Sequence, residues 1–240
     1  MITIMRALTV LFSFVLSTDI AVSGDFATRH IHGFSADGKL FAFEEYGVQD
    51  GSGFPYSTIY IIDTDTDNWT AGSPFKAQLN DETKTVFDAR EASRIQAGPR
   101  MKTFEERGNV VASYRSTQQG IDKMRIVANP RAVVPPIDET IEFRLDRKSF
   151  PATENCEAFG PIAGYRLSQI ATTPDQTTRI IHEDASVPSS RSCPLDYEFA
   201  DLVTYFPPSG TPKIAIIIRM QRVGFEGPDG RYLAVTADLE

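Results

Sequence analysis

Acidic and aromatic side chains are concentrated between residues 44 and 56 of this sequence. Paired carboxylates can donate and accept protons in catalysis, and aromatic rings commonly line the walls of ligand pockets. The candidate ligand-binding residues are Glu44, Glu45, Asp50, Phe54 and Tyr56. The alternative is a strand end followed by a polar hairpin, in which the same carboxylates simply face water.

The length of this segment favours a role beyond joining two strands. A hairpin connection usually needs about two to five residues. The turn-rich segment that follows the apolar run Leu40–Tyr46 and precedes Thr58–Asp63 is longer than that and contains Gly51 and Gly53. Binding groups tend to gather on long loops carried by a rigid sheet. We therefore expect residues 44–56 to border the main ligand or partner surface.

Two histidines near the start of the chain are candidate metal ligands. His30 and His32 alternate along a predicted strand, so both imidazoles would lie on one face, where they could bind Zn²⁺ or Cu²⁺. His182 could complete the site, but a metal needs about three or four converging ligands and no spacing here defines a third. We favour the alternative, in which these histidines face solvent, and expect no cofactor.

The acidic run that begins at Asp63 and continues at alternate positions to Asp67 imitates the start of a calcium loop. An EF-hand would need glycine and glutamate where this chain has Asn68 and Pro74. We therefore expect a hairpin turn. Trp69, the only tryptophan, is expected to pack in the core.

No motif of a known catalytic centre is present. The sequence lacks Gly-x-Ser-x-Gly, His-Glu-x-x-His, a phosphate loop and a dinucleotide fingerprint. We therefore assign no catalytic residue and expect a non-catalytic binding or interaction protein, with an unknown protein or small molecule as its partner. The alternative is a hydrolase of envelope polysaccharide or peptide that uses Glu44, Glu45 or Asp50 as acid and base, because such enzymes need no local motif.

The charge of the chain excludes two classes of partner. Its formal net charge is −8, and no run of basic residues interrupts that balance. Nucleic acids and anionic membranes are recognised through clustered lysine and arginine. We therefore expect neither as a partner.

The first 23 residues are typical of an export signal. Arg6 precedes the apolar stretch Ala7–Leu16, and the small residues Ala21 and Ser23 suit a signal peptidase. The stretch is too short for a membrane helix, which needs about 20 apolar residues, so no integral membrane span is expected. We expect cleavage between Ser23 and Gly24, a periplasmic or secreted protein, and a single β-rich domain over residues 24–240.

The chain contains two cysteines, Cys156 and Cys193. An exported protein with a single pair of cysteines usually oxidises it. Neither cysteine lies in a Cys-x-x-Cys motif, which argues against a catalytic or metal-binding thiol. We expect the two residues to form a disulfide.

The elements that must position these side chains are mostly short antiparallel strands. β-Branched and aromatic runs bounded by turn residues predict them. The predicted strands are Leu40–Tyr46, Thr58–Asp63, Val110–Tyr114, Lys123–Ala128, Thr140–Leu145, Gly164–Ala171, Arg179–Glu183, Phe199–Tyr205, Ile214–Val223 and Tyr232–Ala237. Of these, Ile214–Ile218 is apolar on both faces, which predicts a central strand covered on two sides.

Residues 81–107 break the strand pattern. Apolar residues from Val86 to Ile95 recur at helical spacing, Asp81 can cap the start, and Gly98 can end the helix. A second short helix is expected to follow before residue 108. The sequence therefore predicts a mainly β fold with one helical excursion.

Two segments resemble known families. The segment Phe34–Phe43, in which an Asp37-Gly38 turn leads into a strand, is followed after a gap by a strand Ile59–Asp63 that ends in aspartate. This arrangement resembles the blade unit of WD40-like and TolB-like β-propellers. Taken longer, Gly33–Tyr56 and Gly224–Thr236 are similar to a family of predicted secreted bacterial proteins catalogued as a domain of unknown function. The resemblance implies export and a β-rich fold, either propeller-like or an irregular sandwich, and it implies no reaction.

Overall fold

The computed structural model describes residues 24–105 and 107–239. The predicted export signal, residues 1–23, lies outside the described residues. Within them, no helix combines the length and the apolar character that crossing a bilayer would require.

Three antiparallel sheets make up most of the fold, so the prediction of a mainly β protein with antiparallel strands is confirmed. The N-terminal sheet contains β1 (Thr28–Phe34), β2 (Leu40–Val48), β3 (Pro55–Asp63), β4 (Asn68–Trp69) and β5 (Phe75–Gln78). The central sheet contains β6 (Asn109–Ser113), β11 (Pro194–Tyr205), β12 (Lys213–Val223) and β13 (Pro228–Asp238). The outer sheet contains β7 (Arg125–Ala128), β8 (Ile141–Phe150), β9 (Ile162–Ile170) and β10 (Arg179–Glu183).

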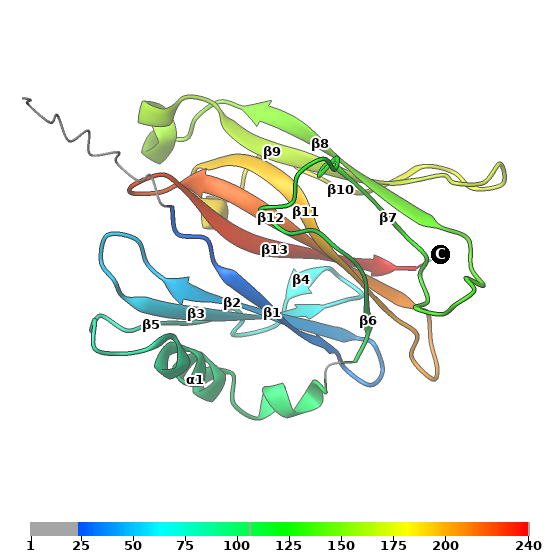
Figure 1. Ribbon diagram of the computed structural model, residues 1–240, viewed down its shortest axis with the longest axis horizontal. Helices are drawn as coiled ribbons and strands as arrows, with labels where there is room; N and C mark the ends of the chain where they lie inside the picture. The colour runs from blue at the N-terminus through cyan, green and yellow to red at the C-terminus, as the bar shows by residue number, and fades with distance from the viewer. Residues whose placement is uncertain (1–23, 106, 240) are drawn as a thin grey trace, which may run out of the picture.

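The sheets are stacked face to face, with the central sheet between the other two (Figure 1). Along β12, Ile214, Ile216 and Ile218 pack in one cluster with the outer sheet, while Ala215 and Ile217 pack in another with the N-terminal sheet. Side chains alternate across a strand, so a strand covered on both faces must be apolar at every position. The predicted double-sided burial of residues 214–218 is confirmed.

The helical excursion is also confirmed. Helix α1 (Val86–Ala97) covers the free face of the N-terminal sheet, and a 3-10 helix over Gly98–Thr103 follows it. Thr85 and Asp88 form a capping box at its start. The buried face of α1 is made of Ala89, Ser93 and Ala97. Its small side chains let the helix approach the sheet closely.

The hairpin at β2 and β3 corrects one expectation from the sequence. The two strands pair in register from Leu40 opposite Asp63 to Val48 opposite Pro55. The connection is therefore residues 49–54, shorter than the expected loop, because the polar residues Glu44 and Glu45 lie inside β2. The resulting fold is an irregular, sandwich-like stack, and the propeller alternative is not confirmed.

The predicted disulfide is confirmed. Cys156 and Cys193 are bonded, with their Cα atoms 5.6 Å apart. The bond joins the 3-10 helix Glu154–Phe159 to the residue that precedes β11. It thereby anchors the segment 188–193 that leads into the central sheet.

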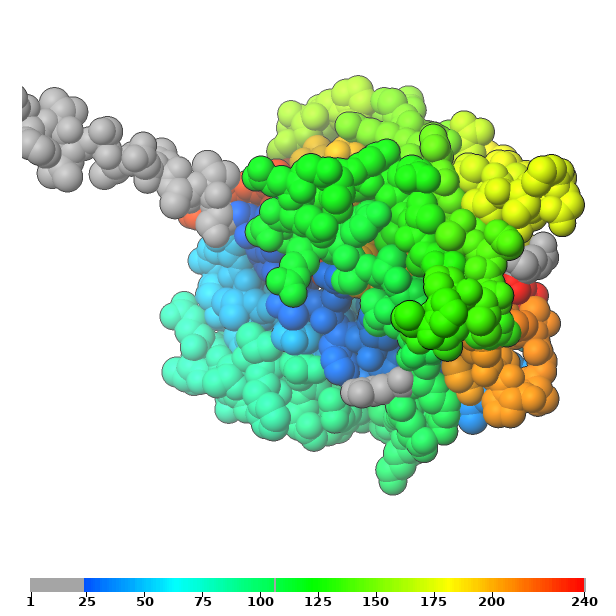
Figure 2. Space-filling model, turned by 45° about the vertical axis from the view of Figure 1, so that its right-hand side comes forward, coloured from blue at the N-terminus to red at the C-terminus, as the bar shows by residue number. Residues whose placement is uncertain are grey.

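The chain crosses between the layers along one side of the molecule. After α1 it passes through β6, at one edge of the central sheet, and continues to β7 in the outer sheet. Figure 2 shows this green part of the chain extending from the blue N-terminal strands to the yellow-green outer sheet. The opposite edge of the central sheet is β13, and the candidate site lies there.

Candidate functional site

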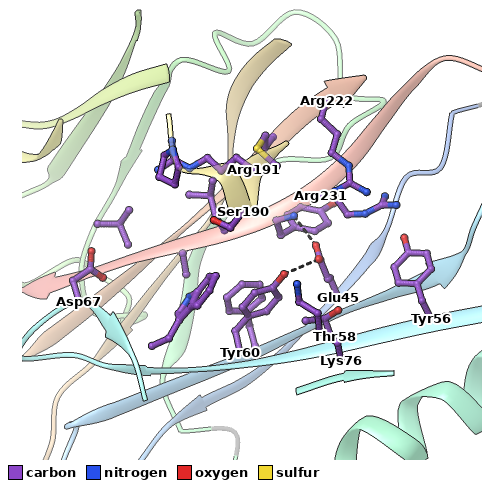
Figure 3. Close-up of a pocket in the computed structure, with 18 of the residues that line it drawn as sticks. Glu45, Tyr56, Thr58, Tyr60, Asp67, Lys76, Ser190, Arg191, Arg222 and Arg231 are labelled. Carbon is purple, nitrogen blue, oxygen red and sulfur yellow. Dashed lines mark hydrogen bonds between the residues drawn. The ribbon is translucent and has the colours of Figure 1, made fainter. Parts of the chain in front are cut away.

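A cavity of about 420 Å³ lies where all three sheets meet beside β13. The N-terminal sheet supplies one wall through β2, β3, β4 and β5, and the outer sheet supplies the other through β9 and β10. The lining also includes the segment 188–191, residues of β12 and β13, and Asp67 from the turn before β4. Figure 3 shows these side chains converging from the two walls on either side of β13. We refer to this cavity as the β13 pocket.

Glu45 joins the N-terminal sheet to β13. Its Oε1 accepts a hydrogen bond of 2.9 Å from the Tyr60 hydroxyl, and its Oε2 accepts one of 2.8 Å from the backbone N–H of Tyr232 (Figure 3). The side chain is buried, and burial raises the pKa of its carboxyl above the usual range despite these bonds. Glu45 is thus a satisfied, buried carboxyl at the floor of the pocket.

Asp67 makes the same kind of contact farther along β13. Its Oδ1 accepts hydrogen bonds from the backbone N–H of Thr236, at 2.7 Å, and from the hydroxyl of that residue, at 2.9 Å. Burial raises the pKa of the Asp67 carboxyl. The residue adopts a φ of 53°, a left-handed conformation that aspartate tolerates better than most residues. The acidic turn predicted from Asp63 is therefore a turn, and it directs Asp67 to β13.

The N-terminal segment binds the first part of the same edge. The N–H of Ala27 donates to the carbonyl of Gly230 at 3.0 Å, and the N–H of Gly230 donates to the carbonyl of Asp25 at 2.9 Å. Arg231 forms an ion pair with the Asp25 carboxylate, and its guanidinium lies 4.8 Å from the centre of the Tyr56 ring. The Tyr56 hydroxyl donates to Asp25 at 2.8 Å. Residues 25–27 therefore occupy the β13 edge at Gly230, next to the lining residues Tyr56 and Arg231.

The outer-sheet wall carries Arg191, which is held by Asp184. Its Nη1 lies 2.7 Å from Asp184 Oδ2, and its guanidinium stacks 4.8 Å from the centre of the Tyr165 ring. Burial opposes ionisation of Asp184, but contacts with His182, Arg191 and the Tyr165 backbone N–H outweigh it and lower the pKa to about 2. The ionised carboxylate holds the Arg191 side chain in place at the pocket.

The opposite wall is aromatic. Phe43 stacks on Tyr60 with ring centres 4.7 Å apart, and Trp69 follows at 5.8 Å. Trp69 is 49% exposed, so the expectation that it packs in the core is wrong. It lies on the two-residue strand β4, both of whose residues are exposed, and it lines the pocket. The exposed Lys76 lines the same wall and has no ion-pair partner among the described residues.

The structure separates the five predicted ligand-binding residues. Glu45 and Tyr56 both line the β13 pocket. Glu44 points to the opposite face of β2, where it bonds Arg90 of α1 at 2.9 Å. Asp50 accepts a 3.2 Å bond from the backbone N–H of Glu226, and neither it nor Phe54 is part of the pocket lining.

The three histidines do not come together. The rings of His30 and His32 lie 4.7 Å apart on β1. His32 is buried, with its Nε2 3.4 Å from Glu44 Oε2, so the expectation that it faces solvent is wrong. His182 lies on β10, in the outer sheet, and bonds Asp184 at 3.0 Å. Within residues 24–105 and 107–239, no group of three or more His, Cys, Asp or Glu residues is arranged to hold a metal ion.

The basic residues of the pocket are not among the site residues predicted from the sequence. They are Lys76, Arg191, Arg222 and Arg231. The segment Gly224–Thr236, singled out by its resemblance, contains one of these four and pairs with the other resembling segment through the bond from Tyr232 to Glu45. The resemblance of both segments to the same family was therefore the one signal in the sequence that could have linked β2 and β13.

Comparison with known proteins gives a family and no activity. The family model described as "Predicted secreted protein (DUF2259)" matches residues 42–238. No curated protein and no solved structure matches. The matched range includes both walls of the β13 pocket.

Proposed function

We propose that this chain, which belongs to the family of predicted secreted proteins DUF2259, is a non-catalytic binding protein that takes its ligand in the β13 pocket. The protein is periplasmic or secreted, in keeping with the family and with the disulfide between Cys156 and Cys193. The convergence of an aromatic wall, several cations and an open strand edge on one cavity carries the proposal. Concave sites that combine aromatic walls with converging polar groups are typical of ligand sites.

The positions of the carboxylates support binding over hydrolysis. Glu44 and Glu45 lie on opposite faces of β2, so they cannot act on one bond. The other carboxylate in the lining, Asp67, bonds Thr236, whereas Glu45 bonds Tyr232. Four residues of a strand span about 13 Å, whereas the acid and base of a glycosidase lie about 5 to 10 Å apart.

Trp69 makes the proposal directly testable. It is the only tryptophan and lines the pocket, so its fluorescence reports on this site alone. We expect that at least one compound from a panel of oligosaccharides, short peptides and small carboxylic acids changes Trp69 emission. At a concentration of about 100 times its Kd, the same compound should raise the Tm by about 5 °C.

Two exposed lysines give a matched pair of variants. Lys76→Ala removes a cation from the pocket, whereas Lys102→Ala removes one from the 3-10 helix after α1. Only the first should weaken the response to the active compound. If no compound on the panel changes both Trp69 emission and the Tm, the pocket is not a ligand site. Appearance of cleaved compounds in the mixture, by mass spectrometry, would contradict the non-catalytic assignment.

A further inference from the structure

We propose, building on the function proposed above, that the ligand is an extended acidic peptide segment that pairs through its backbone with β13 at Ala234. Such pairing requires backbone N–H and C=O groups of β13 that face the pocket. In an antiparallel ladder, alternate residues direct both N–H and C=O away from the partner strand. Strands β12 and β13 pair without a bulge from Lys213 opposite Asp238 to Val223 opposite Pro228. Ala234 lies opposite Ile217 in that ladder.

The backbone N–H and C=O groups of the even-numbered residues of β13 point away from β12, toward the pocket. Gly230 bonds the N-terminal segment, the N–H of Tyr232 bonds Glu45, and the N–H of Thr236 bonds Asp67. These backbone groups all point away from β12. The backbone N–H and C=O of Ala234 therefore point the same way, between the carboxylates of Glu45 and Asp67. No residue that the structure describes donates to its carbonyl or accepts from its N–H on this side.

The open position offers a partner two hydrogen bonds on one residue. An extended peptide laid along β13 would donate to the Ala234 carbonyl and accept from its N–H, as in strand addition to a sheet edge. The carboxylates on either side occupy the neighbouring N–H groups and limit how far a second strand can pair. This arrangement suits a short segment and blocks the edge-to-edge association that a fully open strand would permit.

The space around Ala234 suits the side chains of an extended peptide. Ala234 packs with the cluster that faces the N-terminal sheet and is only partly buried, so its methyl group leaves room in front of Tyr60. The N-terminal wall offers Trp69. The opposite wall offers Arg191, which lies across β13 from Tyr60 in Figure 3. Successive side chains of a strand alternate between two faces, so each wall would receive every second side chain.

One unpaired cation in the pocket favours an acidic peptide. The lining contains Lys76, Arg191, Arg222 and Arg231. The three arginines are already paired with carboxylates: Arg191 with Asp184, Arg222 with Asp229, and Arg231 with Asp25. The two carboxylates of the lining, Glu45 and Asp67, are bonded to β13, whereas Lys76 has no ion-pair partner among the described residues. An acidic side chain beside the open edge would meet that lysine.

The first test uses peptides of defined chemistry. Two pools of acetylated, amidated pentapeptides, without Cys or Trp, would carry a fixed central glutamate or a fixed central lysine. We expect the intact protein to retain members of the glutamate pool in native mass spectrometry, with the lysine pool bound at least tenfold more weakly. Lys76→Glu should reduce that preference at least tenfold, and Lys102→Glu should leave it unchanged.

The second test asks whether the backbone makes the contact. The best-bound peptide would be N-methylated at one position at a time, and only the residue opposite Ala234 should lose at least tenfold in affinity. Ala234→Pro removes the N–H on the protein side, and proline is tolerated at an outward-facing edge position. If that variant does not fold, the N-methyl series still decides. Amide exchange at Ala234 should be fast in the free protein and slow by at least tenfold with peptide bound.

The outcomes separate this inference from the proposed function. An equal loss of affinity at every N-methylated position, or no slowing of amide exchange at Ala234, would overturn pairing with β13. Binding of sugars or small acids with Trp69 quenching, but of neither peptide pool, would overturn the peptide and leave the pocket as a ligand site. Failure of every compound to change Trp69 emission would remove both proposals.

Discussion

Glu44 and Glu45 are neighbours on β2, yet the pKa values of their carboxyl groups are shifted in opposite directions. Burial opposes ionisation of Glu44, but contacts with His32, Arg90 and Ser57 outweigh it and lower its pKa to about 2. For Glu45, burial prevails over its hydrogen bonds and raises the pKa. The difference arises because alternate residues of a strand face different layers. One faces α1 and its arginine, and the other faces the pocket.

These shifts predict opposite pH dependences for two adjacent substitutions. The pKa of Glu45 is higher in the folded state than in the unfolded chain, where the ordinary pKa of glutamate is 4.5. The contribution of Glu45 to the free energy of unfolding therefore falls as pH rises above that value. In urea titrations at several pH values, the stability difference between the wild type and Glu45→Gln should shrink as pH increases.

Glu44→Gln is the matched control at the neighbouring position. The contribution of Glu44 is present above pH 4.5 and is lost as pH falls toward about 2. The difference between the wild type and Glu44→Gln should therefore shrink as pH decreases. Two differences with the same pH slope would contradict the assignment of the two carboxyls to different environments.

At the scale of elements, the disulfide stabilises a wall of the pocket as well as the fold. Cys193 lies two residues after Arg191, which together with Ser190 lines the pocket. The bond closes a loop with a sequence separation of 37 residues. A loop of that length restricts the unfolded chain by about 4 kcal/mol on the chain-entropy model.

We expect a Cys156→Ser, Cys193→Ser double variant to lose about 4 kcal/mol in urea unfolding. The response of Trp69 to a bound compound should weaken as well, because the Arg191 wall is no longer anchored. Reduced wild-type protein provides the control, because reduction breaks the same disulfide without changing the sequence. A variant that unfolds at the wild-type urea concentration would show that the bond does not constrain this region.

Over the whole molecule, the segment that follows the predicted cleavage site is part of the core structure. Asp25 bonds Tyr56 and pairs with Arg231, whose side chain is 10% exposed. Residues 25–27 also occupy the β13 edge next to the pocket. Removal of this segment would take from the buried Arg231 its nearer carboxylate and leave only the contact of 3.4 Å to Asp229. Breaking a buried ion pair costs about 3 to 5 kcal/mol.

We predict that the exported protein begins at Gly24. N-terminal sequencing of protein from a periplasmic fraction would identify the first residue, and residues 1–23 intact in a membrane pellet would contradict a cleaved signal. A chain that begins at Gly24 should be stable. A chain that begins at Thr28 should lose about 3 kcal/mol or more in urea unfolding, because Arg231 then lacks Asp25.

The sequence alone determined the features that depend on short-range patterns. Strand periodicity identified most of β2, β3 and β6 to β13, and the spacing over residues 81–107 identified the helical excursion. Continuous apolarity over residues 214–218 indicated a strand covered on two faces. Two cysteines in an exported chain indicated their bond. Each of these features follows from period, turn residues or residue count, and none requires knowing which strands meet.

Tertiary structure alone decided the composition of the candidate site. The bond from Tyr232 to Glu45 joins residues 187 positions apart, and the bond from Thr236 to Asp67 joins residues 169 positions apart. Such pairings depend on how three sheets stack, which is the sum of many non-local contacts and leaves no local pattern. For the same reason Trp69 faces the pocket although it was expected in the core, and Glu44 and Glu45 face different layers. A residue type shows what chemistry is available, and only the packing of distant strands determines which groups share a cavity.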